Sequence, residues 1–347
     1  MGCKNSLLYI WTINNVRCVI GIFKDRNAFV VPMLFVVAFA LKFAFIRDPL
    51  PAEAATAGGI LDKVIYKVLW QKVNAGVLAI ICISIIVFSG IALNYMLAAK
   101  RMYQRSHMLT ALSFVLFTSL FAGLQRMQAG ILMLPITLLL YGQMTKLYQS
   151  AHPKTVVVNI GLIVGLGTLL YHPYWWMLPC CYVALMQMRP FRFNEWVLLL
   201  IGFLIPAYVV LSYEYLTDQW NPAQHWPVWD PMKTLPDRNP WWIAAIALSI
   251  IWVITGFSAW QDANRRMLIQ TRKNWYLLLI MGLFTLPSIF YPQGNLYEGI
   301  TLLLLPTSAL AAHAFTGESR SGLKLYFFWF IVVSCIVLSW AVIAGKM

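Results

Sequence analysis

Charged residues are scarce in this chain. Asp, Glu, Lys and Arg make up 11% of its 347 residues, whereas hydrophobic residues make up 61%. Soluble globular domains carry about one-quarter charged residues, so this composition excludes an ordinary soluble fold. The apolar runs are unbroken and about as long as a spanning helix, unlike the short alternating segments of a transmembrane β-barrel. We therefore predict an all-α fold, a polytopic transmembrane helical bundle.

Several common functional signatures are also missing. The chain has no phosphate-binding glycine loop, no nucleophile elbow and no HExxH zinc motif. None of its six cysteines lies in a long loop, so we do not expect a disulfide framework. His172, Cys180 and Cys181 lack metal-type spacing, and we predict no metal site there. Residues 1–21 lack a convincing cleavage site, so we expect the first span to be an uncleaved anchor.

Hydropathy divides the chain into about eleven spans. They are residues 29–46, 74–96, 109–124, 128–146, 156–171, 174–188, 196–215, 241–260, 275–291, 299–315 and 323–343. With the N-terminus inside, the inner segments hold 17 of the 26 cations and four of the 12 acids. Cytoplasmic loops are enriched in Lys and Arg, so we predict a cytoplasmic N-terminus and a periplasmic C-terminus. This asymmetry accounts for the net charge of +14 without a nucleic-acid partner.

The spans form one membrane domain. We assign residues 1–27 to a cytoplasmic N-terminal segment and residues 28–347 to a single polytopic domain with outer loops at 47–73 and 216–240. Within the first loop, Leu61 to Trp70 has an apolar stripe and is too short to span, so we expect a helix lying on the membrane surface. Lys42 falls near the end of the first span, and we expect its amine to snorkel towards the interface.

One part of the chain resembles a known family. The pattern consists of Lys146-Leu147-Tyr148, Tyr171-His172-Pro173, Arg189-Pro190-Phe191, Glu195-Trp196, Gly202 and Pro206. In this pattern, residues 145–208 resemble a Bacteroidetes-type family of bacterial multi-span inner-membrane proteins of unknown function. The resemblance implies an inner-membrane location and supplies no activity. We interpret Arg189, Arg192 and Glu195 as a topology element with a local ion pair.

A second resemblance concerns topology alone. Glycosyltransferases of the GT-C class, which use polyprenyl-phosphate sugar donors, also begin inside and carry an essential acid in a large outer loop after the first span. Asp48 stands at that place here, and Glu53 follows it. The chain departs from the usual pair of acids one residue apart, because Arg47-Asp48-Pro49 offers only one. The resemblance implies a GT-C-like arrangement with Asp48 and Glu53 as catalytic candidates.

Each candidate residue has two interpretations. Asp48 could accept a proton from a hydroxyl or coordinate a divalent cation, or it could simply end a helix in an Asp-Pro turn. Arg126 lies in a tight outer turn, where it could hold a lipid phosphate or only snorkel. His172 could bind phosphate or belong to an aromatic belt, and Glu298 could be a site residue or a helix-dipole partner.

Two hypotheses follow from these residues. The first is a GT-C-like membrane protein that handles a polyprenyl-phosphate-linked substrate, with Asp48 as base and Arg126, His172 and Glu298 binding the substrate. The second is a non-catalytic subunit or scaffold of a cell-envelope assembly. Both require membrane lipids as neighbours. Convergence of Asp48, Arg126 and Glu298 on one outward cavity would distinguish them.

Overall fold

The computed structural model describes residues 23, 29–49, 52, 58–103, 107–148, 150, 152–218, 240–290, 296–316 and 322–343. Within these residues the chain is helical and forms no β-strand. The α-helices are α2 (Val30–Arg47), α3 (Ile60–Ile65), α4 (Ala75–Ala99), α5 (Leu109–Leu120), α6 (Ala129–Lys146), α7 (Pro153–Leu170), α8 (Met177–Met188), α9 (Phe193–Leu216), α10 (Pro240–Asn264), α11 (Ile269–Ile289), α12 (Leu296–Thr316) and α13 (Gly322–Ile343). Shorter turns are the π-helix η1 (Tyr66–Trp70) and the 3-10 helices η2 (Ala122–Gln125) and η3 (His172–Trp176).

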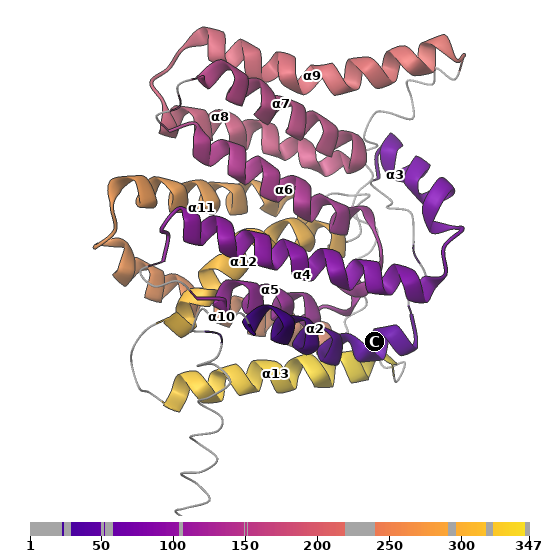
Figure 1. Cartoon of the computed structure of the whole chain (residues 1–347), viewed down its shortest axis with the longest axis vertical. Coiled ribbons are helices and arrows are strands. Elements are labelled where there is room, and N and C mark those ends of the chain that lie inside the picture. Colours follow the sequence, from indigo (N-terminus) through magenta and orange to yellow (C-terminus); the bar gives the residue numbers. More distant parts are fainter. Residues whose placement is uncertain are drawn as a thin grey trace, which may run out of the picture.

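The longer helices lie broadly side by side in one stack, and α3 lies outside it at one end (Figure 1). Six of them, α2, α4, α7, α9, α10 and α12, are long and apolar enough to cross a membrane. The predicted helical membrane bundle is therefore confirmed. Helices match all eleven expected spans in position, but α5 and α8 have only 12 residues each. Such a helix is about 18 Å long against a hydrocarbon core of about 30 Å, so eleven crossings stay a prediction.

Helices α5 and α12 form the centre of the bundle. Every residue of α5 is buried, including four hydroxyl residues. Helix α12 packs on α5, α6, α10 and α11, and 78% of its apolar window is buried. By contrast, only 17% of the corresponding window of α9 is buried, and α9 packs mainly on α7. The hydrophobic core therefore sits around α5 and α12, and α9 is an edge helix.

The C-terminal end of α5 is held by side chains from other elements. The last carbonyls of a helix have no partner within the helix and must be satisfied elsewhere when they are buried. Gln125 of η2 donates from Nε2 to the carbonyl of Thr118 at 2.5 Å. The Cys335 thiol of α13 lies 3.5 Å from the carbonyl of Leu116. These contacts anchor η2 and α13 to the buried helix.

Helices α7 and α9 pack closely through small residues. A side chain at Gly202 of α9 would place its Cβ 2.6 Å from the carbonyl of Val158 and 3.2 Å from the Cα of Gly161. A Cβ on Gly165 would lie 3.0 Å from Pro206. Gly161 and Gly165 thus form a small-xxx-small face that lets the two backbones approach. Gly202 and Pro206, which carry part of the family resemblance, are contact residues of this pair.

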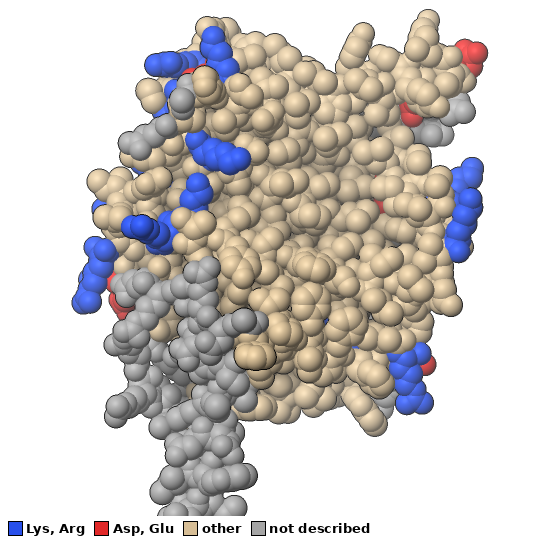
Figure 2. All heavy atoms as spheres, viewed as in Figure 1, with Lys and Arg blue, Asp and Glu red and all other residues tan. Residues whose placement is uncertain are grey.

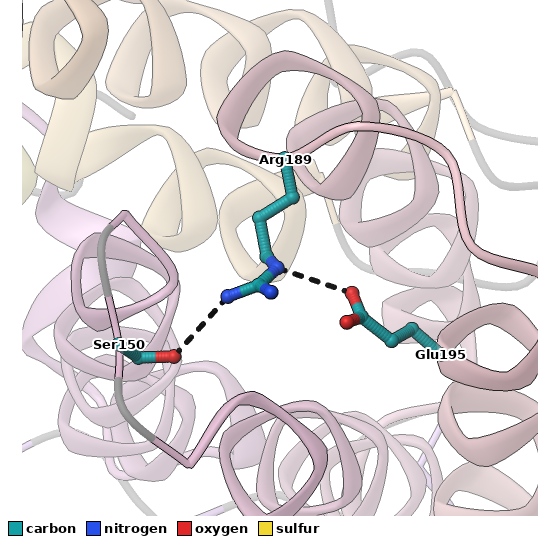
Figure 3. Close-up of polar contacts among 3 residues, drawn as sticks. All are labelled: Ser150, Arg189 and Glu195. Carbon is teal, nitrogen blue, oxygen red and sulfur yellow. Dashed lines mark hydrogen bonds and ion pairs between the residues drawn. The ribbon is translucent and has the colours of Figure 1, made fainter.

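Two opposite ends of the bundle can be defined by their contacts. At one end, which we call the Arg189 end, the Arg189 side chain points between Glu195 and Ser150 (Figure 3). Its Nε lies 3.2 Å from Glu195 Oε2, an ionic contact that lacks hydrogen-bond alignment, and Nη1 donates to Ser150 at 3.5 Å. This is the ion pair expected from the sequence. Figure 2 shows Lys and Arg mainly at the left and right of the view, where the helices end, with a largely uncharged band between the two sides.

The other end, which we call the Arg126 end, carries α3, η2 and η3. The Gly59 N–H donates to the carbonyl of Leu170 at 3.0 Å, and Gly58 pairs with Tyr171 in an isolated bridge. A Cβ at Gly59 would collide with the backbone of Leu169, so only glycine permits this approach. The segment that leads into α3 is therefore attached to the α7–η3 junction. The 0% exposure of Asp62 places the α3 carboxylate against the protein.

We predict that Gly161→Leu destabilises the protein, because the added side chain meets the backbone of α9 at Phe203 and Gly202. Overpacking of this kind costs about 1–3 kcal/mol, so the thermal midpoint of the detergent-purified protein should fall by several degrees. Gly76→Leu is the matched control, because its nearest neighbour would be Asn74 Oδ1 at 3.7 Å. Equal midpoints for the two variants would contradict the close α7–α9 packing.

Candidate functional site

The turn between α5 and α6 presents Arg126. Helix α5 ends at Leu120, η2 follows, and Arg126 adopts an extended backbone before α6 begins at Ala129. The Arg126 side chain is half-buried. Its guanidinium is close enough to the Tyr297 phenol at the start of α12 to interact with it electrostatically. The ring of Tyr297 lies over Gly123, where any side chain would collide with it.

Glu298 joins the same neighbourhood from α12. It lies in the first turn of α12 and is 1% exposed. A Cβ on Gly130 would lie 3.1 Å from the Glu298 Cα and 2.5 Å from the Thr301 hydroxyl, so the first turns of α6 and α12 are in contact. Both of these helix ends carry partial positive charge, which favours an anion nearby. Arg126 and Glu298 therefore lie on neighbouring elements, while their convergence with Asp48 on one outward cavity stays a prediction.

Two glutamines flank Arg126 and have unused polar atoms. Gln125 is 4% exposed and Gln128 is 2% exposed. Within the described part of the chain, Gln125 Oε1 and Gln128 Nε2 have no hydrogen-bond partner. A buried amide without a partner costs about 1–3 kcal/mol, which a bound polar group would offset. We call Gln125, Arg126, Gln128, Tyr297 and Glu298 the Arg126 site.

The remaining predicted residues lie on other elements. Asp48 is the C-terminal cap residue of α2, its N–H donates to the carbonyl of Ala44 at 3.0 Å, and its side chain is exposed. His172 begins η3 and is half-buried. Helix α2 packs on α4, α5 and α13, and η3 packs on α7, α8 and α11, whereas η2 packs on α4, α5, α12 and α13. Glu53 lies outside the described residues.

Lys42 is the clearest correction to the sequence analysis. We expected its amine to snorkel, but Lys42 is 0% exposed inside the bundle. Its Nζ donates to the Thr118 hydroxyl of α5 at 3.0 Å, and the Cys82 and Cys335 thiols lie nearby. The expectation is wrong because α2 turns the face bearing Lys42 towards α5 and α13, not towards the lipid. A hydropathy profile cannot show that rotation.

A polar connection links Lys42 to the Arg126 site. The Thr118 hydroxyl accepts a hydrogen bond from the Lys42 amine, and the Thr118 carbonyl accepts one from the Gln125 amide. Gln125 directly precedes Arg126, so one α5 residue connects the buried amine to the turn. Ionisable groups inside a membrane protein are costly and usually functional, which makes Lys42 a candidate that the sequence analysis missed. Its position in an otherwise apolar span was the available signal.

A second buried cluster lies at the Arg189 end. The ring of Tyr103 packs against His107 at 4.4 Å, His313 at 4.8 Å and Trp275 at 5.7 Å, all between centroids. The Tyr103 hydroxyl donates to the carbonyl of Ala309 at 2.8 Å, and burial raises the pKa of this phenol well above its usual value. Tyr103 therefore stays neutral and ties the α4–α5 loop to α12. This cluster of Tyr103, His107, Trp275 and His313 contains two histidines but no acid. We therefore assign it a packing role.

The Arg126 site contains both hydrogen-bond donors and hydrogen-bond acceptors. The Arg126 guanidinium, the Gln128 amide and the N-termini of α6 and α12 are donors, whereas Gln125 Oε1 and the buried Glu298 carboxylate are acceptors. Among the residues that the structure describes, no three His, Cys, Asp or Glu side chains are grouped to hold a metal. Donors of this kind can hold the oxygens of a phosphate, and the acceptors can hold a hydroxyl.

We predict that Lys42→Met leaves the thermal midpoint unchanged or raises it. Met has a similar volume to Lys and removes the buried charge. The Thr118 hydroxyl keeps a hydrogen bond after the substitution, because it donates to the carbonyl of Val115 at 2.8 Å. The exposed Lys63→Met is the matched control, measured by thermal unfolding in the same detergent. A loss of about 3 kcal/mol or more at Lys42 would instead indicate a compensating negative charge beside the amine.

Comparison with known proteins identifies the family but no activity. The model described as "Family of unknown function (DUF6427)" matches residues 63–346. This range runs from within α3 to beyond the end of α13 and includes residues 145–208, where the sequence pattern is densest. No curated protein and no solved structure matches the chain. Because the family model covers most of its length, the chain belongs to this family of unknown function, DUF6427.

Proposed function

We propose that this membrane protein handles a lipid-phosphate-linked substrate at the Arg126 site. The observation that carries the proposal is the contact between the N-termini of α6 and α12 at Gly130, with Arg126 beside Tyr297 and the buried amides of Gln125 and Gln128 next to it in the chain. Arg126 and the amide of Gln128 would hold phosphate oxygens. The buried Glu298 would accept a hydrogen bond from a hydroxyl of the substrate. We place the site at the outer face of a bacterial inner membrane, with the N-terminus inside and the C-terminus outside.

The finer proposal is GT-C-like glycosyl transfer from a polyprenyl-phosphate sugar. Asp48 would accept the proton of the acceptor hydroxyl as its oxygen bonds to the sugar carbon, and the carbon–phosphate-oxygen bond would break. Arg126 would stabilise the negative charge that develops on the leaving phosphate. Glu53 would support Asp48, and His172 would contribute to binding the substrate. The exposed position of Asp48 at the C-terminal cap of α2 is compatible with an acceptor that arrives from water.

The rival proposal is a scaffold for a cell-envelope assembly. It is favoured by the close packing at the site, because Tyr297 fills the space over Gly123 and Gly130 meets Thr301. In this case Arg126 and Glu298 hold α6 and α12 together, Asp48 ends a helix, and the outer loops contact partner proteins. The two proposals differ in whether the side chains are needed beyond stability. That difference can be measured.

We predict that Arg126→Lys and Asp48→Asn abolish function in a deletion strain while the purified variants unfold within about 1 kcal/mol of wild type. Lys keeps the charge of Arg126 but cannot bind phosphate through two parallel N–H groups. The control is Arg47→Gln, an exposed cation next to Asp48, which should complement fully. Growth in a deletion background and thermal unfolding are the two measurements.

Each outcome discriminates between the proposals. Stable variants that fail to complement support handling of a substrate. Stable variants that complement fully contradict it and favour the scaffold. Failure of Arg126→Lys alone would support the phosphate site and remove Asp48 from the chemistry.

A further inference from the structure

A groove runs between α4 and α6 on the outside of the bundle. It has a volume of about 390 Å³, which falls within the range of about 300–1,000 Å³ for small-molecule sites. Two small residues, Ala92 of α4 and Gly142 of α6, belong to its lining, and Gly142 lies opposite Met96. The side chains of Phe88 and Leu139, each 61% exposed, form raised apolar edges. The lining is apolar over most of its length.

The length of the groove matches one leaflet of a bilayer. Its lining on α6 extends from Pro135 to Lys146, eleven residues further along the helix. At 1.5 Å per residue this is about 16 Å, close to half of the hydrocarbon thickness of about 30 Å. The groove therefore begins near the middle of the bundle and reaches the Arg189 end. An acyl chain of the leaflet at that end has this length and polarity.

Apart from the Ser89 hydroxyl, the polar side chains of this lining lie at one end of the groove. Gln143 and Lys146 lie in the last turn of α6, and Lys146 is exposed. Helix α4 ends at the same level with Lys100 and Arg101 just beyond it. Figure 2 shows several cations along the side of this face where α4 and α6 end. A headgroup placed there would meet positive charge.

We propose that the α4–α6 groove is a binding site for one anionic phospholipid of the leaflet at the Arg189 end. One acyl chain lies in the groove, and Lys146 contacts the phosphate with Gln143 as a further donor. Pro135 lacks an N–H and cannot donate the helix hydrogen bond to the carbonyl of Ile131. Helix α6 is therefore locally deformable where the end of the acyl chain would lie. This site lies at the opposite end from the Arg126 site and does not depend on the function proposed above.

The charge argument has a competing explanation. Cations in the last turn of a helix are stabilised by the helix dipole without any ligand. Lys154 provides the comparison, because it is exposed at the same end of the bundle but lies in the first turn of α7, away from the groove. A lipid preference that depends on Lys146 and not on Lys154 would identify a site. A preference that depends equally on both would indicate only a basic surface.

The test is a count of bound lipids by native mass spectrometry of the detergent-purified full chain. Dioleoylphosphatidylglycerol and dioleoylphosphatidylcholine are added separately at equal concentrations. We expect wild type to retain one phosphatidylglycerol in preference to phosphatidylcholine. Lys146→Gln should reduce that preference by roughly fivefold, as expected for one partly exposed ion pair, and Lys154→Gln should not change it.

A second variant tests the groove itself. Gly142→Leu places a side chain in it, starting 3.1 Å from the Met96 methyl group, and should abolish retention of the first lipid. Because Lys146 is a surface residue, its variant keeps the test valid even if Gly142→Leu is unstable. Equal retention of the two lipids by wild type would overturn the proposal. So would an equal loss in the Lys146 and Lys154 variants, or occupation of the groove by a second copy of the chain.

Discussion

The structure depends on satisfying the polar groups of a short helix buried at its centre. Helix α5 has twelve residues, all buried, and an apolar surrounding offers no water to its terminal carbonyls. The bundle supplies partners instead: Gln125 reaches back to Thr118, and the Cys335 thiol approaches the carbonyl of Leu116. The turn that follows α5 is folded so that Gln125 can make this contact. Its neighbour Arg126 is thereby fixed beside Tyr297.

The same constraint accounts for the character of the Arg126 site. Gln125 donates a hydrogen bond from Nε2 to the carbonyl of Thr118. In the described part of the chain, Gln125 Oε1 and Gln128 Nε2 have no hydrogen-bond partner. The N-termini of α6 and α12 meet at Gly130, and the buried Glu298 lies in the first turn of α12. Lys42 is linked to Gln125 through Thr118, which accepts a hydrogen bond from each of them. These groups supply both donors and acceptors, as the phosphate-bearing substrate proposed above would require.

The sequence was most informative about features that depend on residues close together in the chain. Apolar run length and loop charge predicted the helices, the Arg189–Glu195 pair and the turn with Arg126. These features could not predict which face of a helix turns inward, so they did not predict the burial of Lys42 and Asp62. The presence of a single Lys in an apolar span was nevertheless a signal for Lys42. The Gly161-x-x-x-Gly165 spacing was also in view and specifies the α7–α9 contact. Contacts between distant segments, such as Arg126 with Tyr297, have no signature in periodicity.

The most direct test of the central claim is the lipid that accompanies the protein. Wild type, Arg126→Gln and the control Arg47→Gln are extracted with native lipids, and the bound lipids are identified by mass spectrometry. The account predicts that wild type and Arg47→Gln retain a phosphate-linked isoprenoid lipid that Arg126→Gln loses. Identical lipid profiles for all three proteins would contradict a phosphate site at Arg126.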